Sequence, residues 1–290
     1  MKKLLFFLLK ILAIIILFAC VLDVVYTNSF FHSKNRGKIG YIYNSKPQEF
    51  DVVILGSSRS NNHFVTQMFT DQGLKTFNFG MQGSKLFESD LVLKLLLEKK
   101  NKIKNVIIDV DLSLRSDKKS EAVILKFLPY LHDSEVIKNH LMILPNYNFW
   151  YYIPFYRYVK YETKIGAREM IFCAINKKSK ELDFGGYSAL SNTNTTLAEN
   201  IDVDPIRNQY YEEIKSICKK NNINLIAIMT PICENAIGMN YFEKVKKLYP
   251  EIYNYENVVI ENKYFSSCGH MNDTGARIFT ARILKDFFKK

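Results

Sequence analysis

The chain has 290 residues, of which 48% are apolar and 24% charged, with 12 Gly, 7 Pro and 5 Cys. These proportions resemble those of globular proteins, so they exclude a disordered chain, a collagen-like repeat and a small disulfide-stabilised scaffold. The 40 Lys and Arg side chains exceed the 29 Asp and Glu and give a net charge of +11, which permits binding to phosphates or anionic membranes without identifying a partner. The sequence shows no zinc-finger spacing, no Walker-type phosphate loop and no lysine cluster, so we expect no nucleic-acid binding, and we expect no metal or cofactor.

An apolar run follows the short basic N-terminus and extends from Leu4 to Val25, with Lys10 and Asp23 as its only charged residues. As a helix it would be about 33 Å long, enough to cross a hydrocarbon core of about 30 Å. Lys10 can extend its ammonium group to the nearer interface, and Asp23 lies near the far end of the run. The pattern therefore predicts an uncleaved signal anchor over residues 1–28.

A cleaved signal peptide, a lipoprotein signal and a buried core helix are the alternatives for this run. A cleavage site needs small residues followed by polar sequence, whereas the run stays apolar through Val21 and Val25. A lipoprotein signal would use Cys20, but the bulky Phe18 and the apolar residues after Cys20 are unfavourable for it. Basic residues flank the run on both sides, so a comparison of the flanking positive charges barely distinguishes the two orientations in the membrane. Because export signals begin with a short basic segment, we expect the folded domain to lie outside the cytoplasm, on a single-pass membrane protein.

Beyond residue 48, apolar runs typical of buried strands alternate with helical patterns. The expected strands are Asp51–Gly56, Lys75–Gly80, Asn105–Ser113, Asn222–Pro231 and Asn257–Phe265. Helices are expected over Ser84–Lys99, with Ser84 as N-cap, around Tyr210–Lys220, and from near Thr274 to the end of the chain. Strands that alternate with helices form a parallel sheet, whose functional sites gather beyond the carboxyl ends of its strands. The sequence therefore predicts an α/β domain over residues 48–290.

The alternation breaks between Asp117 and Pro205, a stretch too long for a bare loop in a compact domain. We expect a structured, helical insertion there. It contains the aromatic run Asn146–Tyr161, which holds the only Trp. Such residues suit a ligand platform or a surface that rests on a membrane, but a helical cap packed with aromatic side chains is the interpretation that we favour. The polar stretch Ser188–Asn200 is expected to be a mobile loop.

Two segments combine reactive side chains with a position beyond a strand. Ser58 follows the first expected strand, where a serine hydroxyl is exposed beyond the sheet edge, and His270 lies just before the last helix. A serine hydroxyl is a weak nucleophile that needs a base within hydrogen-bonding reach, and a loop histidine can supply one. His63 falls on the helix after Ser58 and is expected to be structural. Arg59 is expected either to orient this loop or to contact an anionic group.

These segments resemble conserved blocks of the SGNH (GDSL-like) hydrolase superfamily, most of all its membrane-anchored bacterial members, the group that includes D-alanyl transfer and polysaccharide O-acetylation proteins. Gly56-Ser57-Ser58 matches the first block, which implies that Ser58 is the nucleophile. The segment Asn78–Ser84 resembles the second block, which implies that the backbone N–H of Gly83 joins that of Ser58 in an oxyanion hole. The resemblance also implies a flavodoxin-like three-layer parallel sheet of the SGNH type.

The end of the chain resembles the last block of the same family. His270-Met271-Asn272, followed by Gly275-Ala276, matches its HLN and GA elements, which implies that His270 is the base. The family has an Asp three residues before this histidine, where the present sequence has Ser267. We expect Ser267 still to direct its side chain to His270 Nδ1. The third block carries an oxyanion Asn in the family, but the aligned stretch Asp109–Ser113 has none, and Asp111 is the other candidate for orienting His270.

The resemblance implies a serine esterase that removes acyl groups, most simply acetyl, from cell-envelope carbohydrate. The alternatives are an O-acyltransferase that uses the same acyl-enzyme with a membrane-bound acyl donor protein, and a non-catalytic module of polysaccharide assembly. A Cys–His protease based on Cys268 is excluded, because residues two apart on one loop seldom face each other. Cys233 and Cys268 each follow an expected strand, so they either form a disulfide that steadies the His270 loop or remain two thiols. Cys173 and Cys218 are expected to be inert core residues.

Overall fold

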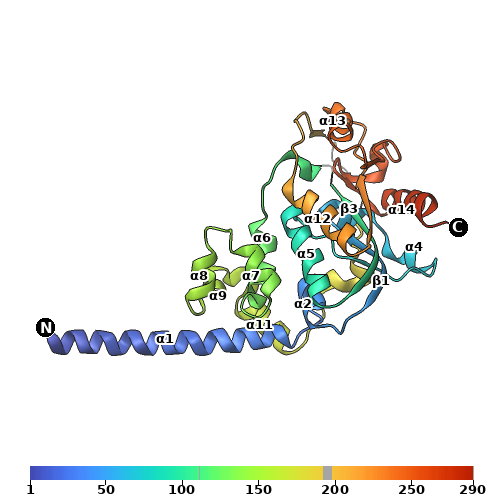
Figure 1. Ribbon diagram of the computed structural model, residues 1–290. Helices are drawn as coiled ribbons and strands as arrows, with labels where there is room; N and C mark the ends of the chain where they lie inside the picture. Colours follow the sequence, from blue (N-terminus) through green and yellow to red (C-terminus); the bar gives the residue numbers. More distant parts are fainter. Residues whose placement is uncertain (111, 192–197, 290) are drawn as a thin grey trace. The chain divides into compact units, whose positions relative to one another are not determined.

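A computed structural model describes residues 1–110, 112–191 and 198–289 (Figure 1). The chain divides into two compact units, each made of two stretches of sequence. The first unit comprises Met1–Ser45 and Ile124–Ser179, and the second comprises Lys46–Val123 and Lys180–Lys290. The residues expected to form one insertion therefore divide between the two units. The second unit carries the sheet and the candidate site.

The second unit is built on a five-stranded sheet with the order β2-β1-β3-β5-β7, in which every neighbouring pair is parallel. The strands are β1 (Glu49–Leu55), β2 (Thr76–Asn78), β3 (Lys102–Asp109), β5 (Asn224–Met229) and β7 (Tyr253–Asn254). The central strands bury continuous runs of Val, Ile and Leu, as expected of a parallel sheet that is covered on both faces. The predicted α/β class with a parallel central sheet is confirmed.

Helices cover both faces of this sheet. The main helices of this unit are α3 (Ser58–His63), α4 (Thr66–Thr70), α5 (Leu86–Glu98), α12 (Gln209–Lys220), α13 (Asn240–Leu248) and α14 (Asp273–Phe287). Helix α5 packs against α12, whereas α14 packs against α3 and α4, and Figure 1 shows these two groups on opposite sides of the strands. One face of α14 is buried in the unit. Its buried residues recur at helical spacing and are Ala276, Phe279, Thr280, Ile283 and Leu284.

Short elements connect these larger ones. The 3₁₀ helices are η1 (Leu112–Arg115), η3 (Lys180–Gly186) and η4 (Asn262–Tyr264). Two small sheets pair β4 (Glu199–Asn200) with β6 (Ala236–Ile237), and β8 (Phe265–Ser267) with β9 (His270–Met271). Helix α6 (Glu121–Ile124) lies where the sequence passes from the second unit to the first. Of the loop expected over Ser188–Asn200, residues 192–197 lie outside the described residues, and Glu199–Asn200 form β4 and not loop.

Two sequence-based expectations for this unit are wrong. The fifth strand of the sheet is Tyr253–Asn254 and not Asn257–Phe265. The apolar run near residue 260 misled the prediction, because Ile260 is exposed and its carbonyl accepts a hydrogen bond from the Glu234 N–H in a loop. The N-cap of α5 is Lys85 and not Ser84, and the Glu88 carboxylate accepts the Lys85 N–H at 2.7 Å. A carboxylate in the first turn thus replaces the expected serine cap.

The first unit is helical in its described residues. Its elements are α1 (Lys2–Phe31), α2 (Gly37–Asn44), η2 (Leu125–Tyr130), α7 (Glu135–Leu141), α8 (Tyr147–Tyr152), α9 (Tyr156–Lys160), α10 (Glu162–Ile165) and α11 (Ala167–Ala174). The aromatic run therefore forms α8 and α9, in line with the helical interpretation. Helix α1 has 30 residues and a mean hydropathy of 3.1 over its most apolar window, so it is long and apolar enough to cross a membrane.

Candidate active site

The candidate nucleophile lies where β1 turns into α3. Gly56 occupies the turn with φ of +128°, and a Cβ there would lie 2.0 Å from Asp109 Oδ1, so both the conformation and the space require glycine. Ser57 caps α3, because its Oγ accepts the Arg59 N–H at 3.1 Å. Ser58 is the first residue of α3 and is half-buried. The local sequence thus presents the Ser58 hydroxyl just beyond the carboxyl end of β1.

Asp109 holds this turn from the neighbouring strand. It ends β3, beside the end of β1, and is almost fully buried. Its Oδ1 accepts the backbone N–H of Ser57 at 3.0 Å and that of Ser60 at 3.1 Å, as well as the Ser60 hydroxyl, and its Oδ2 accepts the Ser57 hydroxyl at 2.9 Å. Hydrogen bonds to an ionised carboxylate are shorter and stronger than neutral ones. Asp109 therefore fixes the backbone on both sides of Ser58.

His270 approaches Ser58 from the β8–β9 hairpin. Its Nε2 lies 2.7 Å from Ser58 Oγ, and its Nδ1 lies 3.0 Å from Ser267 Oγ. When Nε2 accepts the Ser58 proton, Nδ1 carries the ring hydrogen and donates it to the Ser267 hydroxyl. The structure thus brings together three of the side chains singled out in the sequence, and the prediction that Ser267 is directed at His270 Nδ1 is confirmed. The other orienting candidate, Asp111, lies outside the described residues.

The surroundings of His270 keep its ring neutral. Burial and the positive charge of Arg59 lower its pKa from 6.5 to about 4. The guanidinium of Arg59 is itself anchored, since it donates to Thr230 Oγ1 at 2.8 Å and to the carbonyl oxygens of Thr230 and Pro231 at 2.8 and 2.7 Å. Of the two roles expected for Arg59, these bonds fit the orienting one, because they tie α3 to the residues that follow β5.

His63 supports the histidine loop from the other end of α3. It is fully buried, and its Nε2 accepts the backbone N–H of Met271 at 3.1 Å. Burial, with the nearby Arg59 and His270, holds the pKa of His63 well below its usual value. The side chain is therefore a neutral acceptor with a structural role, as the sequence predicted.

A cavity of about 220 Å³ opens over the hydroxyl and the imidazole. Ser58, Ser267, His270 and Gly83 all line it, so both residues expected to supply oxyanion N–H groups lie at one cavity. Gly83 has φ of +76°, a backbone conformation that side chains rarely adopt. Other lining residues are Lys85, Ser113, Arg115 and Glu199. The opening is small and most of its lining residues are polar or charged, which suits a short acyl group attached to a hydrophilic molecule.

A disulfide fixes the base of the histidine loop. Cys233 and Cys268 are bonded with a Cα–Cα separation of 4.7 Å, and the Cys233 N–H also donates to the Cys268 carbonyl at 3.0 Å. Of the two alternatives left by the sequence, the bonded one is correct, although Cys268 follows β8 and not a strand of the main sheet. Cys173 and Cys218 are buried, and burial raises the pKa of each thiol to about 12, which makes them unreactive.

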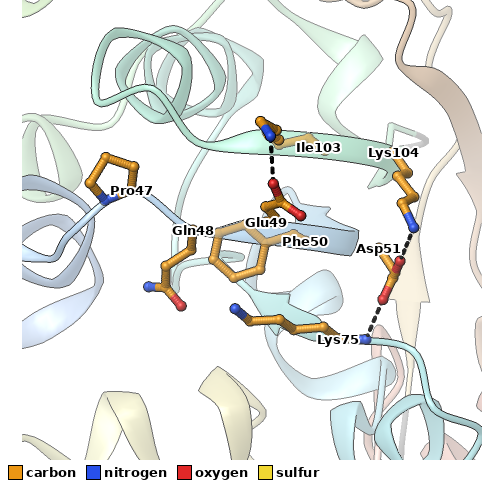
Figure 2. A pocket seen from close by; sticks show the side chains of 9 residues that line it. Pro47, Gln48, Glu49, Phe50, Asp51, Lys75, Ile103 and Lys104 are labelled. Carbon is orange, nitrogen blue, oxygen red and sulfur yellow. Dashed lines mark hydrogen bonds and ion pairs between the residues drawn. The ribbon is translucent and has the colours of Figure 1, made fainter.

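A second, larger pocket of about 690 Å³ lies at the opposite, amino end of β1 and β3 (Figure 2). Four of its charged side chains form two ion pairs. Lys102 contacts Glu49 at 2.5 Å, Lys104 contacts Asp51 at 2.7 Å, and Asp51 also accepts the backbone N–H of Lys75 at 2.8 Å, as the dashed lines in Figure 2 show. Parallel sheets gather their functional groups at the carboxyl ends of the strands. The smaller cavity at Ser58 is therefore the better candidate site.

Asp109 is the residue of this site that the sequence did not reveal as functional. The signal was present as an acidic residue at the end of a buried apolar strand, but its partners on the Ser57–Ser60 turn depend on the pairing of β1 with β3. Within the described residues, no group of three or more His, Cys, Asp and Glu side chains is arranged to hold a metal ion. Comparison with protein-family models and with curated proteins found no match to this chain.

Proposed function

We propose that this protein is a serine esterase of the SGNH type that removes acyl groups from cell-envelope carbohydrate. The observation that carries the proposal is the hydrogen-bonded series of Ser58 Oγ, the His270 ring and Ser267 Oγ, with distances of 2.7 and 3.0 Å. The strand order supports it, because β2-β1-β3-β5-β7 follows the flavodoxin-like pattern, in which ligands bind where the order reverses between β1 and β3. Ser58 and Asp109 lie at that reversal.

The reaction follows from the order of these atoms. Ser58 Oγ attacks the acyl carbon while His270 Nε2 takes its proton, and the backbone N–H groups of Ser58 and Gly83 stabilise the oxyanion of the tetrahedral intermediate. His270 then returns the proton to the sugar oxygen, which leaves as a hydroxyl, and the acyl group stays on Ser58. A water molecule activated by the same nitrogen releases the acid and restores the serine. Ser267 keeps the imidazole in the required tautomer.

A second candidate is an O-acyltransferase with the same acyl-enzyme. The observation that favours it is the partner of His270 Nδ1, which is the Ser267 hydroxyl and not a carboxylate. A hydroxyl orients the ring but supplies no negative charge to stabilise the imidazolium, so attack by water would be slow and a bound sugar hydroxyl could compete as acceptor. A membrane-bound acyl donor protein would then be the partner, and nucleic acid would have no role.

The membrane location belongs to the same proposal. Asp23 of α1 pairs with Arg157 at 2.7 Å, and the Arg157 side chain is only 1% exposed. Removal of the apolar helix together with Asp23 would leave the buried Arg157 charge without its partner, at considerable cost. An uncleaved single-pass anchor accounts for the pair. The Cys233–Cys268 disulfide supports an oxidising compartment and hence an extracytoplasmic domain. A reporter enzyme that functions only after export, fused after Lys290, should be active.

The experiment that separates these functions uses the full chain in detergent micelles. Purified protein is incubated with an acetylated polysaccharide, and free acetate is measured with and without a carbohydrate acceptor, beside the Ser58→Ala variant. Acetate release that depends on Ser58 without an acceptor supports the esterase. Serine-dependent acetylation of the acceptor, with little free acetate, supports the transferase. Equal results from both proteins would contradict both enzymatic proposals and leave a binding module of polysaccharide assembly.

A further inference from the structure

The two ends of helix α1 have different surroundings within the first unit. None of the residues in its most apolar window is buried, whereas the last turns pack on α9, η2 and α11. Asp23 accepts hydrogen bonds from the Phe155 N–H at 2.8 Å and from Arg157 at 2.7 Å. Farther along, Thr27 Oγ1 lies 2.8 Å from the Tyr158 hydroxyl. The stretch without protein neighbours therefore ends close to Asp23.

This boundary gives the level of the bilayer surface, provided that α1 is the proposed anchor. From Leu4 to Leu22 the helix rises by about 27 Å, close to the thickness of a hydrocarbon core. The carboxylate of Asp23, which is costly to place in lipid, then lies at the interface with its arginine partner. Phe155, which donates its N–H to Asp23, must lie at the same level. The loop between α8 and α9 is therefore at the membrane surface.

Most of the exposed side chains on α8, α9 and their connecting loop are apolar or aromatic, and Asn148 and Lys160 are the polar exceptions. We call the large apolar and aromatic ones the interfacial patch, and they are Phe149, Tyr152, Ile153 and Val159. Tyr152 is 70% exposed and Val159 is 63% exposed. Figure 1 shows α8 and α9 at the end of the first unit that is nearer to the free N-terminal half of α1. Tyr and Phe side chains with an adjoining Lys160, which is also exposed, have the composition of protein surfaces that lie in the headgroup region.

We propose that the interfacial patch is a lipid-binding surface that inserts into the headgroup region of the bilayer spanned by α1. The hydrogen bonds from Phe155 and Arg157 to Asp23 join α1 to the segment that carries the patch, so the anchor places the patch at the bilayer. The patch then fixes the tilt and rotation of the first unit on the membrane. The inference rests on the proposed anchor, and its test must be separable from a test of the anchor.

The test uses the full chain in lipid nanodiscs with an environment-sensitive fluorophore on one cysteine. Cys20 is exposed and is replaced by Ser, whereas Cys173 and Cys218 are buried and leave the background unlabelled. Tyr152→Cys reports on the patch and Leu12→Cys on the middle of α1. Ile175→Cys is the matched control in the same unit, because Ile175 is exposed and its neighbour Asn176 lies 3.4 Å from Ser33, beyond the far end of α1.

Nitroxide lipids labelled near the headgroup should quench at least about half of the fluorescence at residue 152, because an interfacial surface lies at the depth of the headgroups. The same lipids should leave the fluorescence at residue 175 nearly unchanged. Residue 12 should be quenched by lipids labelled deep in the acyl chain. Quenching at residue 12 without quenching at residue 152 would overturn the patch while leaving the anchor intact. Protection of residue 152 from both lipid and aqueous quenchers would assign the patch to a protein partner instead and also overturn it. No quenching at residue 12 would overturn the anchor and, with it, this inference.

Discussion

The backbone N–H of Met271 donates a 3.1 Å hydrogen bond to His63 Nε2. This bond joins the end of α3 to the hairpin that carries His270. Because Ser58 begins α3 and His63 ends it, one six-residue helix holds the candidate nucleophile at its first residue and supports the candidate base through its last. The distance between the Ser58 hydroxyl and the His270 ring therefore depends on His63.

Replacement of His63 by Leu should damage both stability and activity. The Met271 N–H would be buried without an acceptor, which costs about 1–3 kcal/mol of the free energy of unfolding. The midpoint of denaturant unfolding and the esterase rate are the measurements. His270→Ala, which removes a half-buried ring, should abolish activity with a much smaller loss of stability. If His63→Leu were as stable and as active as the parent, the supporting role of His63 would be disproved.

Asp109 should be the most sensitive residue of the site for stability. In Asp109→Ala the donors of Ser57 and Ser60 lose their shared acceptor, and several kcal/mol of unfolding free energy should be lost, at about 1–3 kcal/mol for each unsatisfied buried group. Asp109→Asn retains one acceptor oxygen and should lie between the alanine variant and the parent. The thermal unfolding midpoints of the parent, Asp109→Asn and Asp109→Ala give the order of their stabilities. An alanine variant with unchanged stability would show that the turn is held by other contacts.

The pH dependence of activity follows from the neutral state of His270. Its pKa is lowered to about 4 in the folded protein, so the ring is the unprotonated base at neutral pH. The rate should stay level from pH 7 to about pH 5 and fall with an apparent pKa near 4. Since the unfolded chain takes up this proton near pH 6.5, the stability contributed by the neutral ring is present above that pH and lost as the pH falls toward 4. Circular dichroism at each pH separates the two effects, and a rate that halves near pH 6.5 would contradict the assignment.

Ser267→Asp should strengthen the site. A carboxylate beside Nδ1 stabilises the imidazolium and raises the pKa of His270, so the acid limb of the rate profile should move upward. Hydrolysis should become faster by roughly 10-fold or more, given the size of the orienting effect of such a carboxylate in serine proteases. Ser267→Ala is the control and should be slower than the parent. An Asp variant that folds normally but has the parent's rate and pH profile would exclude Ser267 as the orienting residue.

Local sequence patterns predicted the elements whose signals are local. The strands before Ser58 and Ser113, the helix before Asn222 and the apolar N-terminal helix were all found near their predicted positions, since each depends on a run or a period within a few residues. The fifth strand was misplaced, because the short run Val258–Ile260 is as apolar as a strand but has no neighbouring strand. Its true counterpart, β7, pairs through only two residues.

The residues of the site also separate into those that a local motif predicted and those that only tertiary contacts reveal. Ser58 and His270 were found because their short motifs lie beside predicted elements. Asp109 and the Asp23–Arg157 pair were missed as contacts, because 49 to 134 positions of sequence separate the partners. Only the pairing of β1 with β3 brings Asp109 beneath the turn, and only the packing of α1 on α9 brings Arg157 to Asp23. Such contacts follow from tertiary structure, which no local pattern encodes.

The most direct test of the central claim is the rate of p-nitrophenyl acetate hydrolysis by the full chain, compared with that of Ser58→Ala. Ser113→Ala is the matched control, because Ser113 lines the same cavity but lies on η1. If Ser58 is the nucleophile, the parent and Ser113→Ala should hydrolyse the ester at similar rates, and Ser58→Ala should fall to the uncatalysed rate or within a small factor of it. Equal rates for the parent and a correctly folded Ser58→Ala protein would contradict the account.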